Sequence, residues 1–415
     1  MADGSASKSP TRGSHTICLP VAKGTYIELV RDVAAFRVWL LEAFAAIPEA
    51  FPAGFGDGFE MKDLRVSKKL NLLLRRVLLR DGSAYTIRPS FAMPYMTACA
   101  EEVEKALFLR KFAVPYWALA YVFGRNSMYW YRLECHFGRN SIVGTTVRKT
   151  KIPRQLLADE HHQTRDGEKV YLATTVGDGC CLGVGVAEDA STEQLTQGYG
   201  DFREEALNVE PDYTPETVNT DGWKGTRAAW PALFPTIILL RCFLHAWLKI
   251  RDRGKNLKDT FFELSRRVWE VYHAPNKRSQ SQRIRHLKIW ANANLTGTVL
   301  VAVLDLCDKK DAWLAAHDYP EGHHTSNMLD RMMRSMNRYF TCSQHLHGKK
   351  GTRHHVRAYA LLHNFTPWNP VTAKANDGWQ SPAERLNKHR YHDDWLQNLL
   401  VSTSMNGYRT APQKA

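Results

Sequence analysis

The chain has 415 residues, and its 44% hydrophobic and 11% aromatic content excludes an intrinsically disordered protein. A net charge of +14, from 56 Lys and Arg against 42 Asp and Glu, favours a polyanionic partner. The apolar runs are far shorter than the roughly 20 residues of a membrane-spanning helix, so we expect no membrane protein.

The first residues are predicted to form no ordered structure. Residues 1–20 begin with a polar stretch that lacks the apolar core of a signal peptide, which predicts a disordered lead-in. The eight cysteines include no CxxC pair, which favours reduced thiols over disulfides or a zinc ribbon. We therefore expect an intracellular protein, cytoplasmic and associated with the nucleoid, or nuclear if the source is eukaryotic.

Residues 21–150 are predicted to form an all-α DNA-binding domain. Three stretches, 26–46, 62–79 and 96–112, place apolar residues three and four apart, as helices do. The second stretch is also basic, so it either lies on DNA or presents a solvated helix face. Glycine, proline and serine predict loops at 51–59 and 80–90.

Residues 114–138 have the spacing of a helix-turn-helix. The small Ala120 lets a second helix approach, and Gly124 permits the turn between the two helices. The second helix would then be the recognition helix, although an ordinary helical hairpin is the alternative. The predicted DNA contacts here and in the basic linker 139–154 are Arg125, Asn126, Tyr129, Arg132, Arg139 and Lys149.

From residue 151 to residue 251 the pattern changes to strands. Short runs rich in apolar and β-branched residues predict three antiparallel strands at 155–160, 169–176 and 181–187. A helix at about 191–207 follows, and then two further strands at 217–220 and 236–240. This order predicts an α/β fold with a mixed five-stranded sheet of ribonuclease H type.

Residues 252–320 are predicted to be a helical insertion, since no strand pattern interrupts their helical periodicity. Its three tryptophans, Trp269, Trp290 and Trp313, fit buried helix faces better than a site that stacks on an unpaired base. The core would return at 321–370 with an amphipathic helix, 323–340, that has Thr325 or Ser326 as its N-cap. Residues 371–415 are predicted to be a helical tail.

A basic, histidine-rich strip follows the returning helix. Without clustered cysteines, its histidines and the pair His323-His324 favour phosphate contact over a zinc site. The predicted DNA contacts of this strip are Lys349, Lys350 and Arg353.

Acidic residues are concentrated in one part of the chain. Residues 156–221 contain 15 acidic and 3 basic residues, whereas residues 1–155 contain 23 basic and 13 acidic residues. This distribution suits a metal-binding sheet between surfaces that hold a phosphate backbone. A chance acidic surface is the alternative.

Asp159, Asp221 and Asp330 are the predicted metal ligands. The first two end strands that are neighbours in the predicted sheet, so their carboxylates converge, and convergent carboxylates favour a cation between them. Asp330 lies on the returning helix. A turn role is the alternative for Asp221, because Asp before Gly is common in turns.

The other acids in this region fit the site less well. Glu160 should point to the opposite face of its strand from Asp159. Glu321 lies in a Pro-Gly loop, and Glu384 follows two Pro-containing breaks. Hard oxygen ligands beside basic surfaces fit two Mg²⁺ ions, with Mn²⁺ as a substitute. One ion would activate the attacking oxygen and the other would stabilise the leaving 3′ oxygen of a phosphodiester.

Four segments, LLADEHH, NTDGWKG, RCFLHAWLK and TSNMLDRMMRSMNR, resemble in this order the DDE-type transposases of insertion sequences and Mutator-like elements. That family has a second Asp in a D-G-x-x-G turn and a Cys/Asp-x-x-His motif on the next helix, and residues 221–225 and 242–245 match both. The resemblance covers about residues 155–365. The sequence departs at the third acid, where the family pattern expects Glu and Asp330 stands.

The resemblance implies a ribonuclease H-like core that nicks transposon ends and joins the freed 3′-hydroxyl to target DNA, as a homo-oligomer on DNA. His245 would face the site beside Asp221 and contact the scissile phosphate or orient water, or else pack under the sheet. Two other functions stay open. A DNA-binding regulator derived from a transposase would not need the three acids, and a structure-selective nuclease would not need the N-terminal DNA reader.

Overall fold

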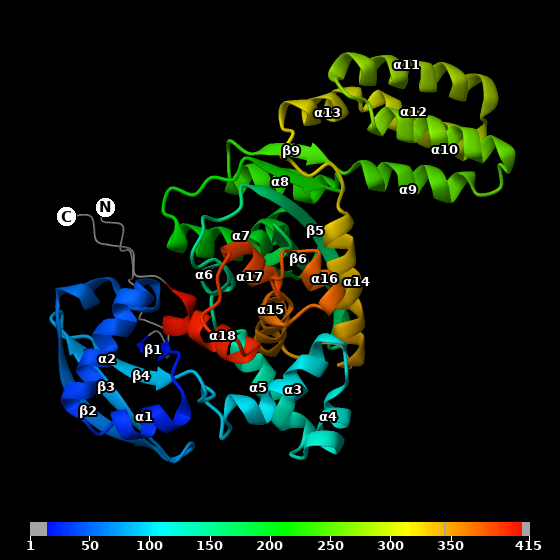
Figure 1. The fold of residues 1–415 in the computed structure, drawn as a ribbon. Coiled ribbons are helices and arrows are strands. Elements are labelled where there is room, and N and C mark those ends of the chain that lie inside the picture. The colour runs from blue at the N-terminus through cyan, green and yellow to red at the C-terminus, as the bar shows by residue number, and fades with distance from the viewer. Residues whose placement is uncertain (1–14, 344–345, 409–415) are drawn as a thin grey trace, which may run out of the picture.

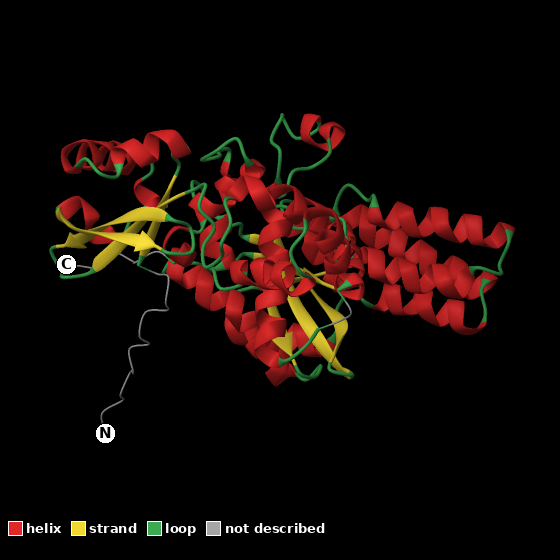
Figure 2. Ribbon diagram, turned by 90° about the horizontal axis from the view of Figure 1, so that it is seen from below, coloured by secondary structure: helices red, strands yellow, loops and turns green. Residues whose placement is uncertain are grey.

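The structure is a computed structural model and describes residues 15–343 and 346–408. An N-terminal α/β unit, a central sheet covered by helices and a helical arm lie side by side (Figure 1). Seen from below, the arm extends away from the central sheet on the side opposite the N-terminal unit (Figure 2). None of the described helices has the length and apolar character that crossing a membrane requires.

The N-terminal unit is a four-stranded sheet with helices, not an all-α domain. Its sheet has the order β1-β4-β3-β2, with β1 parallel to β4 and the other pairs antiparallel. Its elements are β1 (Thr16–Leu19), α1 (Lys23–Leu29), α2 (Val33–Ala46), two 3-10 turns (Pro48–Ala50 and Ala53–Asp57), β2 (Phe59–Ser67), β3 (Leu72–Leu79) and β4 (Ala84–Pro89). Two predictions are therefore wrong: 62–79 is a hairpin rather than a helix, and 80–90 contains a strand.

A buried arginine interrupts the strand pattern in the sequence of this hairpin. Along β3 the buried positions are Arg75, Val77 and Leu79, which is the two-residue period of a strand. Arg75 interrupts the apolar alternation, and its Nε donates to the carbonyl of Val30 at 3.0 Å. The predicted lead-in is also wrong from residue 16 on, because β1 is buried; residues 1–14 lie outside the described part.

Four helices connect the N-terminal unit to the central sheet: α3 (Ala100–Lys111), α4 (Tyr116–Phe123), α5 (Ser127–Phe137) and α6 (Ile142–Thr146). The pair predicted at 114–138 is present as α4 and α5, with Gly124 in the turn at a φ of +72°. The linker predicted at 139–154 is wrong, because every residue of α6 is buried.

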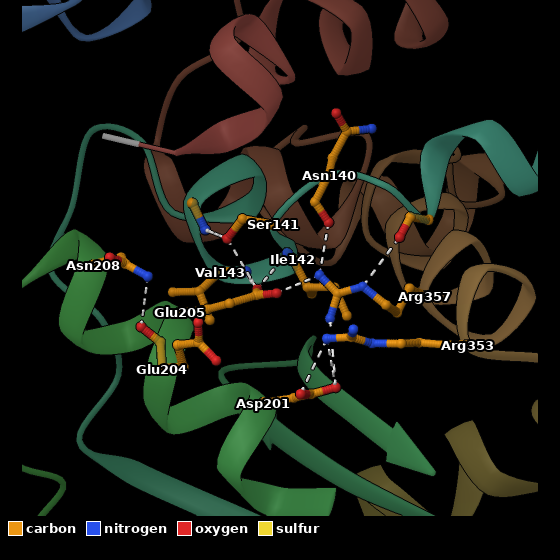
Figure 3. A network of polar contacts seen from close by, with 12 residues as sticks. Asn140, Ser141, Ile142, Val143, Asp201, Glu204, Glu205, Asn208, Arg353 and Arg357 are labelled. Atoms are coloured by element: carbon orange, nitrogen blue, oxygen red, sulfur yellow. Dashed lines mark hydrogen bonds and ion pairs between the residues drawn. The ribbon is translucent and has the colours of Figure 1, made fainter. Parts of the chain in front are cut away.

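Glu205 anchors α6 to the rest of the molecule. Its Oε2 accepts hydrogen bonds from Ser141 Oγ at 2.9 Å and from the backbone nitrogens of Ile142 and Val143 at 2.6 and 3.0 Å (Figure 3). Its other oxygen forms an ion pair with the buried Arg357. The first turn of α6 is thus held by a carboxylate at its positive end, a favourable placement.

The central sheet is the predicted mixed five-stranded sheet, in the order β7-β6-β5-β8-β9. Strands β5, β6 and β7 are antiparallel, whereas β8 and β9 run parallel to β5. Its elements are β5 (Gln155–Arg165), β6 (Glu168–Gly177), β7 (Cys180–Ala187), α7 (Thr192–Val209), β8 (Thr217–Thr220), α8 (Lys224–Leu233) and β9 (Ile238–Arg241). All five predicted strands and the helix predicted at 191–207 are present; β5 runs five residues past its predicted end at 160, and the other ends shift less.

The insertion is a bundle with its own core, made by α9 (Phe243–Gly254), α10 (Asp259–Tyr272), α11 (Lys277–Asn294), α12 (Gly297–Asp308) and α13 (Lys310–Ala315). Trp313 is buried in that core, and Trp269 and Trp290 pack against it. This agrees with the predicted core role of the three tryptophans.

The chain returns with α14 (Asn327–Cys342), α15 (Lys349–Phe365), α16 (Pro370–Lys374), α17 (Pro382–Asn387), α18 (Trp395–Ser402) and a 3-10 turn (Ser404–Gly407). α14 and α15 cover one face of the sheet, and α7 and α8 cover the other. The predicted tail is helical, but it is not peripheral. Every residue of α18 is buried, and Ser404 Oγ accepts from Cys18 N at 3.0 Å and donates to Ala50 O at 2.6 Å. Residues 409–415 lie outside the described part.

Candidate metal centre

Strand register brings Asp159 and Asp221 together. Leu157 on β5 pairs with Asn219 on the parallel strand β8, so residues 159 and 221 stand at the same level. Asp159 lies in the middle of β5 rather than at its end, but β8 stops at Thr220. Beside Asp159, β5 therefore has no partner on its β8 side. Asp221, the residue after β8, lies at this open position.

Asp330 and His245 complete the cluster. Ligand atoms of Asp159, His245 and Asp330 lie within 4.8 Å of one another, and so do those of Asp159, Glu160 and Asp221. Asp159 belongs to both groups, with His245 and Asp330 in one and Asp221 in the other, so the four predicted site residues fall into two groups that share Asp159. These two groups are the only clusters of three or more His, Cys, Asp or Glu side chains in residues 15–343 and 346–408, so the zinc alternative gains no support.

Crowding changes the protonation of Asp159. Burial, followed by the nearby charges of Asp221 and Glu160, raises the pKa of Asp159 to about 7. Buried carboxylates this close retain protons unless a cation is shared between them. The carboxylate oxygens of this site fit a divalent cation such as Mg²⁺ or Mn²⁺.

Glu160 reaches the site from the opposite face. Its Oε1 accepts hydrogen bonds from Tyr199 of α7 at 2.6 Å and Thr226 of α8 at 2.5 Å, as expected for a side chain on that face. Its Oε2 is buried and has no hydrogen-bond partner among the described residues. The prediction that Glu160 points to the opposite face of its strand is confirmed, but one of its oxygens also lies in the ligand group with Asp159 and Asp221.

Asp221 has the turn contact that was its alternative role. Its Oδ1 accepts from Trp223 N at 2.7 Å, the contact of a turn residue. It also lies in the ligand group with Asp159 and Glu160. Gly222 follows at a φ of +89°, so the backbone of this turn favours glycine.

Cys242, His245, Ser326 and Asp330 form one hydrogen-bonded network. Ser326 Oγ lies 3.2 Å from Cys242 Sγ and 3.4 Å from His245 Nδ1, and it donates to Asp330 Oδ2 at 3.1 Å. The hydrogen bond to Cys242, and beyond it the charges of Cys242, Asp159 and Asp330, raise the pKa of His245 to about 9 despite burial. His245 is therefore a cation at neutral pH.

Ser326 is a positioning residue that the sequence did not reveal. It occupies the predicted N-cap position of α14, but it makes no capping hydrogen bond to the backbone and orients Asp330 instead. This use of the hydroxyl depends on α9 lying next to Ser326, which the sequence does not show.

Replacing Ser326 by Ala should weaken Mg²⁺ binding by about 10-fold, because a residue that orients a metal ligand typically contributes 10–100-fold to affinity. Calorimetric titration of the protein with Mg²⁺ measures this. Ser326→Thr keeps the hydroxyl and should bind nearly as wild type, and Thr341→Ala removes an exposed hydroxyl from the far end of α14 as a control. Equal affinities of Ser326→Ala and Thr341→Ala would contradict the role.

The predicted DNA contacts on α5 are partly used for structure. Asn126 Oδ1 accepts from Tyr129 N at 2.7 Å and so caps the helix. The guanidinium of Arg125 lies over the ring of Tyr129, and that of Arg139 over the ring of Tyr95, at 5.3 and 5.1 Å. Arg125, Arg132 and Arg139 are exposed.

Three of the other four predicted DNA contacts form ion pairs within the protein. Lys149, Lys349 and Arg353 form ion pairs with Glu49, Glu188 and Asp201 at 2.8, 3.4 and 3.2 Å. Lys350 is exposed.

Of the histidines in the basic strip, His355 is 2% exposed and lies 3.0 Å from both Glu134 and Tyr116, so the expected phosphate contact is wrong there. His345 lies outside the described residues.

No protein-family model matches the chain, and a search of curated proteins finds no match.

Proposed function

We propose that this protein is a DDE-type transposase with a ribonuclease H-like core, which binds transposon ends, cleaves them with divalent metal and joins them to target DNA. The observation that carries the proposal is that Asp159 on β5 shares one ligand group with Asp221, which follows the parallel strand β8, and another with Asp330, on a helix that follows a long insertion. A purely DNA-binding protein has no use for acids gathered around Asp159, whose pKa is raised by burial and by the charges of Asp221 and Glu160.

The topology supports the ribonuclease H-like core. Three antiparallel strands are followed by two parallel strands that are reached through α7 and α8. The acids lie where β5 and β8 separate, next to the carboxyl end of β8, the usual place for chemistry in open α/β sheets. The helical bundle interrupts the core between β9 and α14, as the resemblance implies.

The residues divide the work as follows. Asp159, Asp221 and Asp330 would hold the cations, and Glu160 adds a fourth carboxylate. When bound, two Mg²⁺ ions supply Lewis acidity to the attacking and leaving oxygens of the phosphodiester. The cationic His245 donates a hydrogen bond to a phosphate oxygen, and Ser326 fixes both His245 and Asp330.

The α4–α5 pair is the proposed DNA reader, with the exposed Arg125, Arg132 and Arg139 as its cations. Since transposition joins two ends at one target, the protein would act as a homo-oligomer on DNA. The net charge of +14 is consistent with this partner.

A strand-transfer assay tests the proposal. A duplex that carries the inverted repeat flanking the gene, with a free 3′-hydroxyl, is mixed with supercoiled plasmid, the protein and Mg²⁺. We expect covalent joining that stops with chelator and that a 3′-deoxy end cannot support. Cleavage without joining would indicate the nuclease, and binding without either reaction would indicate the regulator; each outcome overturns the proposal.

A further inference from the structure

A cavity of about 270 Å³ lies where three distant parts of the chain meet. The N-terminal sheet provides one side of it, the end of α5 and the residues after it provide a second, and the turn after α18 provides the third. The metal centre does not share a residue with this cavity, so the two are separate features.

The lining of the cavity is polar without being acidic. No carboxylate lines it, whereas five residues with hydroxyls and two with amides do: Thr16, Ser67, Thr86, Tyr95, Thr403, Asn140 and Asn406. Hydroxyl and amide groups donate hydrogen bonds to anions, and a cation would find no charged partner here. The lining therefore selects for a negative or neutral polar ligand.

Arg88 supplies the charge. It projects from β4 into the cavity. Its backbone pairs with β1, but its Nε is buried and has no hydrogen-bond partner among residues 15–343 and 346–408. A guanidinium has five donors, and leaving a buried donor unpaired costs about 1–3 kcal/mol or more for a charged group. An anion in the cavity would remove that cost.

The rim adds further positive charge. Lys69 Nζ donates to Tyr95 O at 3.2 Å, and Arg139 lies over the Tyr95 ring. Burial, and then the charges of Arg139, Lys69 and His354, lower the pKa of His136 to about 4. These cations accumulate with no acid in the lining to offset them, a field that attracts anions.

The volume decides what size of anion fits. It is below the roughly 300–1,000 Å³ of most small-molecule sites. A phosphate group with the atoms next to it fits such a space, whereas a whole dinucleotide or a folded peptide segment does not. Arg is the residue best suited to bind phosphate, because its fork of donors matches two phosphate oxygens.

We propose that this cavity binds a phosphate group through Arg88, and that the phosphate belongs to the backbone of a bound DNA strand. The assignment to DNA rests on the proposed function. It is favoured by the position of the cavity beside Arg139 and the end of α5, since the same strand would then pass both the cavity and the helix pair. A free nucleotide offers the same chemistry and is distinguished below.

The test compares two variants of the full-length protein, each of which loses one positive charge. Arg88→Gln removes the positive charge in the cavity. Arg80→Gln removes an exposed arginine that directly follows β3 and does not line the cavity. Binding to a fluorescent 30-base-pair duplex is followed by anisotropy over a range of NaCl concentrations. We expect Arg88→Gln to weaken binding about 5–10-fold and to lower the slope of log affinity against log salt by about 1. Arg80→Gln should change both much less.

Folding is checked separately. Because the Nε of Arg88 has no hydrogen-bond partner among the described residues, Arg88→Gln should melt at or above the wild-type temperature, and Arg88→Lys should recover part of the affinity. Titration calorimetry with inorganic phosphate and AMP forms the second arm. Tighter binding of AMP than of the duplex, lost in Arg88→Gln, would overturn the DNA assignment.

The outcomes separate this proposal from the proposed function. If strand transfer succeeds while Arg88→Gln and Arg80→Gln bind the duplex equally, the cavity proposal fails alone. If strand transfer fails while duplex binding still depends on Arg88, the transposase proposal fails and the phosphate site stands. If neither DNA nor phosphate binding depends on Arg88, the cavity is not a phosphate site.

Discussion

Replacing Asp159 by Asn should lower metal-dependent DNA nicking on the order of 10³-fold while leaving DNA binding nearly intact. Asp159 belongs to both ligand groups, so its loss disturbs every cation that the centre would hold. Metal ions supply several kcal/mol of transition-state stabilisation in such reactions, which corresponds to about this factor. The basic surfaces that bind DNA are untouched.

Plasmid nicking in Mg²⁺ and in Mn²⁺ measures this effect. Asp212→Asn, an exposed acid between α7 and β8, is the matched control and should nick as wild type. Nicking by Asp159→Asn within a few fold of this control would contradict the site.

The same variant should be more stable than wild type without metal. Because the pKa of Asp159 is raised from 3.8 to about 7 in the folded protein, the folded state binds more protons than the unfolded chain in this range. Stability therefore falls as pH rises from about 4 to 7. Asn carries no such proton, so in chelator at pH 8 Asp159→Asn should gain on the order of 1 kcal/mol. The gain should vanish near pH 4, which urea denaturation at both pH values would show.

Replacing Arg110 by Met should destabilise the protein by about 3–5 kcal/mol, because it leaves a buried carboxylate without its main partner. Arg110 and Glu134 are both fully buried and lie 2.7 Å apart. The guanidinium also donates to Ser343 Oγ at 2.8 Å and lies between the rings of Tyr116 and Tyr339. These contacts join α3 and α5 to α14, the helix that carries Asp330.

Urea denaturation measures the loss. Arg266→Gln is the control, because its ion pairs with Glu263 and Glu270 are half-exposed and should contribute at most about 1 kcal/mol. The double variant Arg110→Met, Glu134→Leu should recover much of the stability, since it removes the orphaned charge. A loss below 1 kcal/mol in the single variant would contradict the importance of the pair.

Glu134 predicts a pH dependence of stability with the opposite sign to that of Asp159. Burial alone would raise its pKa, but the charges and hydrogen bonds of Arg110 and His355 lower the pKa to about 2. The stabilisation is then present above about pH 4.5 and is lost as pH falls toward 2.

The central sheet was predictable because its strands are short apolar runs between clear turns. β9 reads ILLR, a mainly apolar run, whereas β8 reads TVNT and is marked by its β-branched residues before the Asp-Gly turn. The N-terminal sheet was not predictable in this way. Its β3 strand places Arg75 at a core position, so the two-residue period was masked and a helix fitted the remaining residues equally well.

The acids of the site were predictable to the same degree as the sheet. Asp159 and Asp221 follow from the order of the strands, and Asp330 from the helix that returns after the bundle. Glu160 and Ser326 were missed for a common reason. Their roles depend on which helix approaches them, Tyr199 and Thr226 in one case and Cys242 in the other, and strand or helix periodicity carries no such information.

The bond between Ser404 and Ala50 has a consequence for how the protein is made. It spans 354 residues, which a ribosome adds in roughly 18–70 s at about 5–20 residues per second. During that time strand β1 lacks the neighbour that receives its Cys18 amide. The N-terminal sheet is thus the first part synthesised and among the last completed, so a nascent chain of this protein needs protection of that sheet until α18 has emerged.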